Sequence, residues 1–285
     1  MEARTRVLVT GCNKGIGKGI LEVLLEKTFN PKLHILMAVR TPKLGEETKA
    51  ELLTAHPDAS LEVFQLDQGD DASIAAAVER LKGHPIDWLV NNAGTSFSGP
   101  RIDHEVISGT MGVNYHGVKK LTEAFLDAGL INAHGLVVNV TSMAGKFRDL
   151  GTRNPEAYAK LAAYQKGGIT VEELDQIVAA FEKDMLTPEL RSRWRETIYG
   201  SSKLFLNVYT YLLAKQKRVV DKDIQVYASC PGWCKTDMTK TFGDAPPLTN
   251  KEGGDRIAYF LGLHKQIQPE LQGQFFENKA LSALS

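Results

Sequence analysis

The sequence predicts an α/β fold in which helices cover both faces of a doubly wound parallel sheet. Three observations support this prediction: apolar runs alternate with helical patterns, a glycine-rich turn follows the first run, and the strand-like runs have no polar face. Strands without a polar face are buried on both sides, as in parallel sheets. Residues 1–285 are expected to form a single domain.

The expected elements follow one another in regular order along the chain. The strands are Val7–Thr10, Leu33–Val39, Leu61–Leu66, Ile86–Val90, Leu136–Val140, Ile224–Ala228 and a short last one at Gln274–Phe276. The helices are Ile16–Lys27, Glu46–Ala55, one capped by Asp70 or Asp71 and running to Leu81, a long one from about Asp103 to Leu130, and one from Tyr199 through Leu213. This alternation requires right-handed crossovers and predicts a parallel sheet.

The segment from about 151 to 197 does not fit the alternation, because a crossover loop needs far fewer residues. It carries helix start and stop signals at Asn154-Pro155, Gly167-Gly168, the capping box of Thr170 with Glu173, and Thr187-Pro188. We therefore expect a helical insertion at this point.

Composition excludes several classes of protein. Lys+Arg and Asp+Glu number 34 each, so no nucleic acid partner is expected. No apolar run approaches the ~20 residues of a membrane span, and the N-terminus lacks a signal-peptide pattern, which predicts a cytoplasmic protein without a membrane partner. The three cysteines, Cys12, Cys230 and Cys234, suit a reducing compartment and complete no metal site.

A glycine-rich turn joins the first expected strand to the first helix. Gly11 permits a tight turn, Gly15 lets backbone approach a pyrophosphate, and Gly17 lets the helix pack closely on the strand. The helix N-terminus presents free N–H groups and partial positive charge to phosphates. Its place in the chain predicts a Rossmann-type dinucleotide site, and a turn without a ligand is the alternative. The expected ligands in the turn are Gly11, Asn13, Lys14, Gly15, Ile16 and Gly17.

The end of the second strand indicates which dinucleotide binds. Sites for NAD usually place an acid there, but this strand ends in Arg40 and the next acid is Glu46. A guanidinium can bind a 2′-phosphate through two hydrogen bonds, and Lys14 adds a second positive charge. The expected cofactor is therefore NADPH; a solvated surface charge is the alternative for Arg40.

Two further positions follow strands at the same edge. Asp67, after the third strand, is placed to accept a hydrogen bond from an adenine amino group. The fourth strand closes with small residues up to Gly94, which leave room for a cofactor, and Asn91 is expected to anchor backbone in the crevice. For Asp67 and Asn91 a role in stabilising turns stays open.

The pattern Tyr-x-x-x-Lys, which places both side chains on one helical face, occurs three times. The pairs are Tyr115 with Lys119, Tyr199 with Lys203, and Tyr211 with Lys215. Tyr115 precedes the fifth strand, and Tyr211 lies three turns down its helix, too far from the strand ends where ligands bind. Tyr199 begins its helix and follows Ser142 at the end of the fifth strand, so position favours Tyr199.

Carbonyl reduction builds negative charge on oxygen and requires a proton. A free tyrosine has a pKa near ~10, and the Lys203 ammonium is expected to lower the pKa of Tyr199 toward neutrality. Ser142 is expected to hydrogen-bond the carbonyl oxygen. Lys203 could also hold the nicotinamide ribose.

Together these residues resemble the short-chain dehydrogenase/reductase family across essentially the whole chain. The matching motifs are Thr10-Gly11-x-x-x-Gly15-Ile16-Gly17, Asn91-Asn92-Ala93-Gly94, Asn114, Ser142, Tyr199-x-x-x-Lys203 and Pro231-Gly232. The resemblance implies that Asn114 kinks its helix and holds a water linking Lys203 to solvent. It also implies no metal, and a nicotinamide end lined by Pro231, Gly232, Lys235, Thr236 and Asp237, with Thr236 near the carboxamide.

Within the family the chain is similar to the monomeric carbonyl reductases, through Asn13-Lys14-Gly15-Ile16-Gly17, Pro231-Gly232-Trp233, Thr236-Asp237-Met238 and the insertion. This implies a monomer, because the insertion would cover the usual oligomer surface. The expected substrates are ketones, aldehydes and quinones, held by Ser142, Tyr199 and an apolar pocket with Phe97 and Trp233. Cys12 and Cys234 depart from the branch, and Cys234 is expected to border that pocket.

Other functions stay open on the same residues. The chain could act on one defined ketone such as a terpenoid or alkaloid, or as an NADP-dependent alcohol dehydrogenase. A regulator that senses NADPH without turnover would not need Asn114, Ser142, Tyr199 and Lys203. A sugar-nucleotide epimerase would need a larger C-terminal substrate domain than the about fifty residues that follow Trp233.

Overall fold

The computed structural model describes residues 4–29, 32–97, 99, 101–194, 197–240, 245–263 and 269–285. Its centre is an eight-stranded sheet in the order β3-β2-β1-β4-β5-β6-β7-β8. The strands are β1 (Thr5–Thr10), β2 (Leu33–Val39), β3 (Leu61–Gln65), β4 (Ile86–Asn91), β5 (Ile131–Val140), β6 (Gln225–Cys230), β7 (Phe275–Glu277) and β8 (Ala280–Leu281). All neighbours pair in parallel except β7 with β8, which confirms the predicted fold class.

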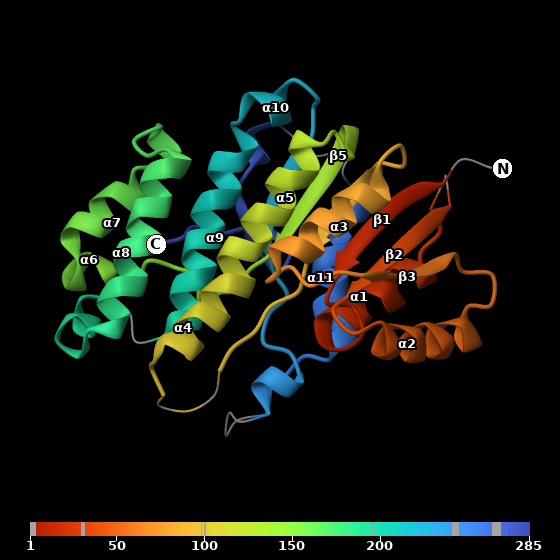
Figure 1. Ribbon diagram of the computed structural model, residues 1–285, viewed down its shortest axis with the longest axis horizontal. Helices are drawn as coiled ribbons and strands as arrows, with labels where there is room; N and C mark the ends of the chain where they lie inside the picture. The colour runs from red at the N-terminus through yellow and green to blue at the C-terminus, as the bar shows by residue number, and fades with distance from the viewer. Residues whose placement is uncertain are drawn as a thin grey trace.

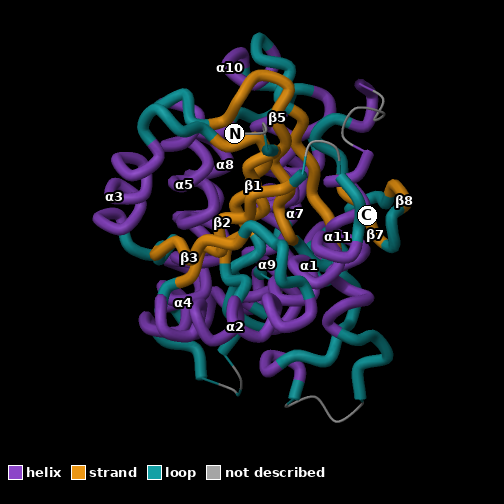
Figure 2. Tube along the Cα trace, turned by 90° about the vertical axis from the view of Figure 1, so that its right-hand side faces the viewer, coloured by secondary structure: helices purple, strands orange, loops and turns teal. Residues whose placement is uncertain are grey.

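Helices cover both faces of this sheet (Figures 1 and 2). Outside the insertion they are α1 (Gly15–Glu26), α2 (Pro42–Ala55), α3 (Asp71–Leu81), α4 (His104–Met111), α5 (Val118–Asp127), α9 (Ile198–Ala214), α10 (Lys217–Val220) and α11 (Asn250–Leu263). Neighbouring residues of β1 alternate between the two faces, because side chains in a strand point to opposite sides. Leu8 packs with α3, α5 and α9, whereas Val7 and Val9 pack with α1 and α11.

The strand order reverses between β1 and β4, which lie side by side although two strand–helix units separate them in the chain. In open α/β sheets, ligands bind at such a reversal, outside the carboxyl ends of the strands. The glycine-rich turn leaves β1 at this edge, and β5 and β6 end at the same edge. The topology therefore brings the predicted site residues to one end of the sheet.

The expected insertion is helical, as predicted. It consists of α6 (Leu150–Arg153), α7 (Pro155–Ala162), α8 (Val171–Leu186) and the 3₁₀ turns η2 (Tyr164–Lys166) and η3 (Pro188–Arg193). The predicted capping box is present: the Glu173 backbone N–H donates to Thr170 Oγ1 at 3.2 Å and the Thr170 N–H to Glu173 Oε2 at 2.8 Å. Figure 1 shows the insertion in green at one end of the molecule, where α8 packs on α4 and α9. Positions 195 and 196 of the predicted segment lie outside the described residues.

Several elements differ from the sequence prediction, among them β5, which begins at Ile131 rather than Leu136, and the short α10 and β8, which were not predicted. The long helix after Asp103 is divided by a π-helical turn, η1 (Gly112–Gly117), between α4 and α5. Helix α2 begins at Pro42 rather than Glu46, because proline suits the first turn of a helix. Helix α11 was not predicted, although Thr249 and Glu252 form a capping box at its start that the sequence could have revealed.

Candidate active site

The glycine-rich turn has the tight geometry that the sequence predicted. Gly11 and Gly15 adopt φ of +63° and +57°, a region that favours glycine. A Cβ on Gly11 would lie 2.8 Å from Ala93 Cα, and one on Gly17 would lie 2.4 Å from Gly11 O. A larger residue at Gly11 would therefore displace the turn from the segment after β4. A larger residue at Gly17 would displace α1 from the turn.

The N-terminus of α1 is open to an anion. Lys14 stands at the N-cap position without a side-chain cap, and the first turn contains no acidic residue. The first N–H groups of the helix therefore keep their hydrogen-bonding capacity and partial positive charge. Asn13 is fixed from behind, since its carbonyl accepts a hydrogen bond from Thr48 Oγ1 at 2.8 Å. This end of α1 fits a pyrophosphate.

Two cationic side chains, Arg40 and Lys14, were expected beside this turn, and only Lys14 forms an ion pair within the described residues. Arg40 follows β2 directly, is exposed, and forms no ion pair within the described residues. Lys14 Nζ lies 2.9 Å from Asp237 Oδ2, and Lys240 lies on the other oxygen of the same carboxylate. These two lysines lower the pKa of Asp237 to about 2. The structure therefore joins the glycine-rich turn to the segment after β6.

Asp67 lies at the carboxyl end of β3, where an adenine ring was expected. Its Oδ1 accepts a hydrogen bond from the Gly69 N–H at 3.0 Å, and its own N–H donates to Ser73 Oγ at 2.9 Å. Both proposed roles are compatible with this arrangement, because one carboxylate oxygen stabilises the turn and Oδ2 stays available.

Asn91 does not face the crevice with its side chain, contrary to its expected role there. Its Nδ2 donates to Thr122 Oγ1 at 2.9 Å and to Asn139 Oδ1 at 2.8 Å, and the residue is buried. The side chain that anchors the crevice is Asn92, whose Nδ2 donates to the carbonyls of Thr10 and Gly11 at 2.8 and 3.1 Å. Consecutive strand residues point to opposite faces, so the motif alone did not decide between the two asparagines.

Tyr199 stands in the first turn of α9. Thr197 caps this helix, with its Oγ1 accepting from the Gly200 N–H at 3.2 Å. The Ser142 hydroxyl, which comes from the loop after β5, lies near the Tyr199 phenol and lowers its pKa. The Ser142 Oγ accepts the Ala144 N–H at 3.1 Å, which orients it. The structure therefore brings Tyr199 and Ser142 together as predicted.

The pKa of Tyr199 shifts in the direction opposite to the prediction. Burial raises the pKa of Tyr199 to about 12, and the nearby Ser142 hydroxyl opposes this rise. Lys203 does not produce the expected lowering, and the dominant effect is the cost of removing the tyrosinate from water. The phenol is therefore protonated at neutral pH, which is the form that a proton donor needs.

Lys203 lies one turn along α9 and is almost fully buried. Its Nζ donates to the Val140 carbonyl at 2.9 Å and stands 5.8 Å from the centre of the Tyr199 ring. Burial lowers the pKa of Lys203 to about 8. Gly94 leaves room for it, since a Cβ there would lie 3.5 Å from Lys203 Nζ and 3.3 Å from Asn114 Oδ1.

Asn114 sits in the π-helical turn η1, where the backbone departs from regular α-helical hydrogen bonding. Its Oδ1 accepts from the Thr95 N–H at 2.8 Å, and its Nδ2 donates to the Thr95 carbonyl and to Ser202 Oγ at 2.9 and 3.0 Å. Ser202 Oγ in turn donates to the Tyr199 carbonyl at 2.7 Å. Ser202, which the sequence analysis did not single out, thus connects Asn114 to the first turn of α9.

The other two Tyr-x-x-x-Lys pairs serve packing. The buried Tyr115 donates its hydroxyl to Asp175 Oδ1 in the insertion at 2.9 Å, and Lys119 pairs with the other oxygen of Asp175. The Tyr211 hydroxyl donates to the Gln165 carbonyl at 3.2 Å. Both tyrosines contact the insertion, which supports the choice of Tyr199.

The segment after β6 closes the other side of the crevice. Gly232 has φ of +87°, and a Cβ there would lie 2.3 Å from Arg256 Nη1. Pro231 before it is buried, and Lys235 after it is exposed. A Cβ on Gly15 would lie 3.7 Å from Thr236 Cγ2, so the segment lies against the glycine-rich turn.

Exposed apolar side chains stand in the segments that border the site. Phe97 and Trp233, the two apolar side chains predicted to contact substrate, are exposed to 43% and 36%, and Met143, directly after Ser142, is exposed to 43%. Cys234 does not border this space as expected: it is buried, and its thiol donates to the Pro231 carbonyl at 3.4 Å. Met143 could have been predicted from its place beside Ser142.

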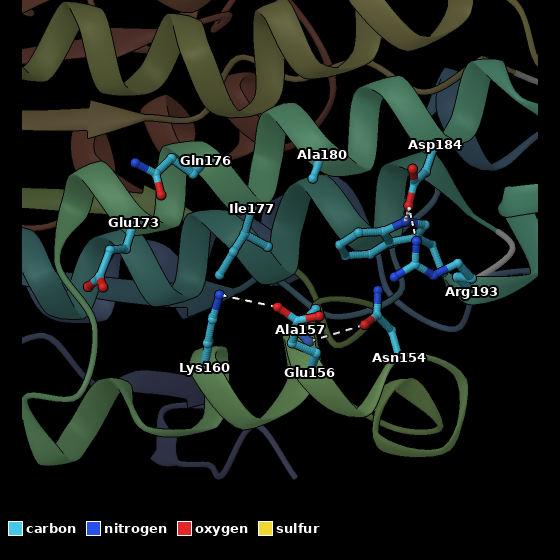
Figure 3. A pocket seen from close by; sticks show the side chains of 11 residues that line it. Asn154, Glu156, Ala157, Lys160, Glu173, Gln176, Ile177, Ala180, Asp184 and Arg193 are labelled. Carbon is cyan, nitrogen blue, oxygen red and sulfur yellow. Dashed lines mark hydrogen bonds and ion pairs between the residues drawn. The ribbon is translucent and has the colours of Figure 1, made fainter.

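The described residues contain no group of three or more His, Cys, Asp or Glu side chains placed to hold a metal ion. They also contain no helix long and apolar enough to cross a bilayer. A hollow in the insertion between α7 and α8 is lined in part by Lys160, Ile177 and Arg193, and contains none of the predicted site residues (Figure 3).

Comparison with known proteins places this site in context. The family model described as short chain dehydrogenase matches residues 5–159. Carbonyl reductase [NADPH] 1 of Sus scrofa is 31% identical, over 98% of this chain and 94% of its own. (+)-Neomenthol dehydrogenase of Arabidopsis thaliana is 30% identical over 96% of each chain.

Two solved structures resemble the whole chain. Salutaridine reductase from Papaver somniferum has a TM-score of 0.79 at 25% identity, covering 96% of this chain and all of its own. NADPH-bound carbonyl reductase from chicken fatty liver has a TM-score of 0.69 at 25% identity, covering 99% of this chain and all of its own.

Proposed function

This chain belongs to the short-chain dehydrogenase family, and from that premise we propose that it reduces the carbonyl group of ketones, aldehydes or quinones with NADPH, with Tyr199 as the proton donor. The observation that carries this proposal is the placement of the Ser142 hydroxyl beside the Tyr199 phenol, with Lys203 behind them. The pair stands at the carboxyl edge of the sheet, the same edge as the open N-terminus of α1.

The crevice fits NADPH on its own chemistry. The uncapped first turn of α1 would hold the pyrophosphate, and the exposed Arg40 together with Lys14 would hold the 2′-phosphate. Pro231, Gly232 and Thr236 would line the nicotinamide end. The bound cofactor would supply a hydride to the carbonyl carbon.

The chain's own residues supply the proton. The buried phenol of Tyr199 keeps its proton at neutral pH and would pass it to the oxygen as negative charge develops there. Ser142, whose hydroxyl lies near that phenol, would stabilise the same oxygen. The Ser142 hydroxyl is oriented by the Ala144 N–H and Tyr199 stands in the first turn of α9, so little reorganisation is needed when substrate arrives.

Lys203 and Asn114 complete the arrangement. A lysine with a pKa of about 8 can release or take up a proton near neutral pH, so Lys203 suits the return of a proton to Tyr199. The carboxamide of Asn114 lies near Lys203, across Gly94, and is fixed by Thr95 and Ser202. We assign Asn114 the role of keeping this proton path aligned.

A narrower function is the second candidate: reduction or oxidation at one defined metabolite. This candidate is favoured by the higher TM-score to salutaridine reductase, 0.79, than to the chicken carbonyl reductase, 0.69. Phe97, Met143 and Trp233 offer an apolar surface that suits either candidate. A panel of quinones, simple aldehydes and polycyclic ketones separates the two, since turnover of one class alone would favour the narrower function.

The test is NADPH oxidation by the wild type and by Tyr199→Phe. We expect the variant to lose at least about 100-fold in kcat, the usual contribution of a positioned acid, while NADPH still binds with unchanged affinity. Binding is measured separately by nicotinamide fluorescence.

The chain provides its own control in Tyr211→Phe. This variant removes a hydroxyl from the same pattern on the same helix, but that hydroxyl bonds the insertion. We expect near-normal turnover from Tyr211→Phe. Near-normal turnover from Tyr199→Phe would refute the assignment of the proton donor.

A further inference from the structure

Gln68 is a buried polar residue that the proposed chemistry does not use. It follows Asp67 at the carboxyl end of β3 and is 4% exposed. Its Nε2 donates to two backbone carbonyls from distant segments, that of Ala93 at 3.1 Å and that of Val113 at 2.8 Å. Its Oε1 is buried without a partner in the described part of the chain. Turning the amide over would place Oε1 against both carbonyl oxygens, so the observed orientation is the favourable one.

One end of this bridge is the π-helical turn η1. Val113 directly precedes Asn114, and a π turn departs from the regular α-helical hydrogen-bond pattern. The Gln68 amide gives the Val113 carbonyl a donor from outside the helix. The backbones also touch, because a Cβ on Gly117 would lie 2.3 Å from Gln68 O. Gln68 therefore supports the turn that carries Asn114.

The other end of the bridge belongs to the cofactor crevice. Ala93 presses against Gly11 of the glycine-rich turn and precedes Gly94, which borders both Asn114 and Lys203. Asp67, the expected adenine partner, directly precedes Gln68 in the chain. One carboxamide thus connects the loop after β3, the loop after β4 and η1.

We propose that Gln68 is a positioning residue that couples the adenine end of the crevice to Asn114 through its hydrogen bonds to the Ala93 and Val113 carbonyls. This inference rests on the proposed function for its effect on catalysis. It predicts that binding of the adenine end of NADPH at Asp67 stabilises η1. Loss of the Gln68 hydrogen-bond donor is expected to remove this effect of adenine binding on η1.

The test compares Gln68→Met and Gln68→Glu with the wild type. Methionine keeps the length of the side chain but donates no hydrogen bond, and an ionised glutamate is isosteric but repels both carbonyls. Ser73→Ala is the matched control, because it loosens the Asp67 backbone in the same loop without touching η1. Each protein is examined by steady-state kinetics and by amide hydrogen exchange of residues 112–118, with and without NADPH.

We expect both Gln68 variants to lower kcat at saturating NADPH by at least about fivefold, as for a buried carbonyl left without its donor. We also expect faster exchange at 112–118 and no protection there by NADPH. Ser73→Ala should raise the KM for NADPH and leave kcat and exchange at 112–118 as in the wild type. If Gln68→Met does not fold, Gln68→Glu carries the same comparison.

Wild-type kcat in either folded Gln68 variant, or exchange altered only at 66–73, would overturn the inference. Failure of the proposed function looks different: the wild type itself would turn over no carbonyl compound. In that case NADPH-dependent protection of 112–118, present in the wild type and absent in the Gln68 variants, still decides whether the coupling exists.

Discussion

Arg40 stands in solvent at the end of β2, where its charge is free to meet a phosphate. Replacing it with aspartate puts a carboxylate where the 2′-phosphate of NADPH would lie and where ribose hydroxyls of NADH can donate. We expect Arg40→Asp to lower kcat/KM for NADPH by at least about tenfold and to raise the relative use of NADH. Rates with both cofactors check this.

Lys217→Asp, the same charge change on α10 away from the crevice, is the control and should leave the preference unchanged. If Arg40→Asp keeps wild-type selectivity, the 2′-phosphate is held by other residues.

The burial of Lys203 has a consequence for stability. Its pKa is about 8 in the folded chain and 10.5 as a free side chain, so the unfolded chain binds more protons between these values. The contribution of this group to the free energy of unfolding therefore rises with pH from about 8 to about 10.5. Urea unfolding of the wild type and of Lys203→Met across this range measures the difference.

We expect the wild type to gain stability relative to Lys203→Met as pH rises through this window. Tyr199 acts in the opposite direction at higher pH: its pKa is raised to about 12, so its contribution is lost as pH rises from about 10 to 12. Parallel pH profiles below pH 10 would contradict the assigned burial of the Lys203 ammonium.

At the scale of elements, the insertion is held by an aromatic cluster. Phe181 of α8 is fully buried and meets Trp194 and Phe205 edge-to-face, with ring centres 5.3 and 5.4 Å apart. We expect Phe181→Ala to lower the free energy of unfolding by about 3–5 kcal/mol, because it removes a ring and leaves a cavity between α8 and α9. Urea unfolding measures this value.

Leu186→Ala on the same helix is the control, since Leu186 is 45% exposed and should cost within about 0.5 kcal/mol. A similarly small cost for Phe181→Ala would mean that the insertion does not pack on α9 as described.

The π-helical turn η1 shows how an element can depend on distant residues. Helical periodicity predicted one long helix through Gly112–Gly117, and only the family resemblance singled out Asn114 as a position where that helix departs from regularity. The Val113 carbonyl accepts a hydrogen bond from Gln68. The Asn114 carboxamide accepts a hydrogen bond from Thr95 and donates one to Ser202. These partners come from other loops and from α9, so a local pattern could not reveal the turn.

At the scale of the whole molecule, the insertion packs on α4 and α9 and contacts η1 and the first turn of α5. Beyond the Tyr115 and Lys119 contacts with Asp175, His116 Nε2 lies 2.8 Å from Glu182 Oε1 on α8. We propose that residues 1–285 act as one catalytic domain and as a monomer, because this face is already occupied within the chain.

Sedimentation velocity at micromolar concentration should give the mass of a single chain, 31.4 kDa. Addition of NADPH should not change it. A stable species of twice that mass would show that another face of the molecule forms an interface.

The sequence by itself determined the parallel sheet, the glycine-rich turn, the existence of an insertion and the choice of Tyr199 over Tyr115 and Tyr211. These features depend on hydrophobic periodicity, on backbone sterics and on the order of motifs along the chain. Each of these is a property of neighbouring residues or of sequence order. Family membership follows from the same motifs, which is why the comparisons agree with the sequence prediction.

Only the tertiary structure decided which asparagine, Asn91 or Asn92, anchors the crevice, and in which direction the pKa of Tyr199 shifts. It also decided that Lys14 pairs with Asp237 and that Gln68 bridges two loops. Each of these depends on burial or on a partner far away in the chain. Burial and distant partners are set by the packing of segments against one another, so the order of residues in the sequence does not reveal them.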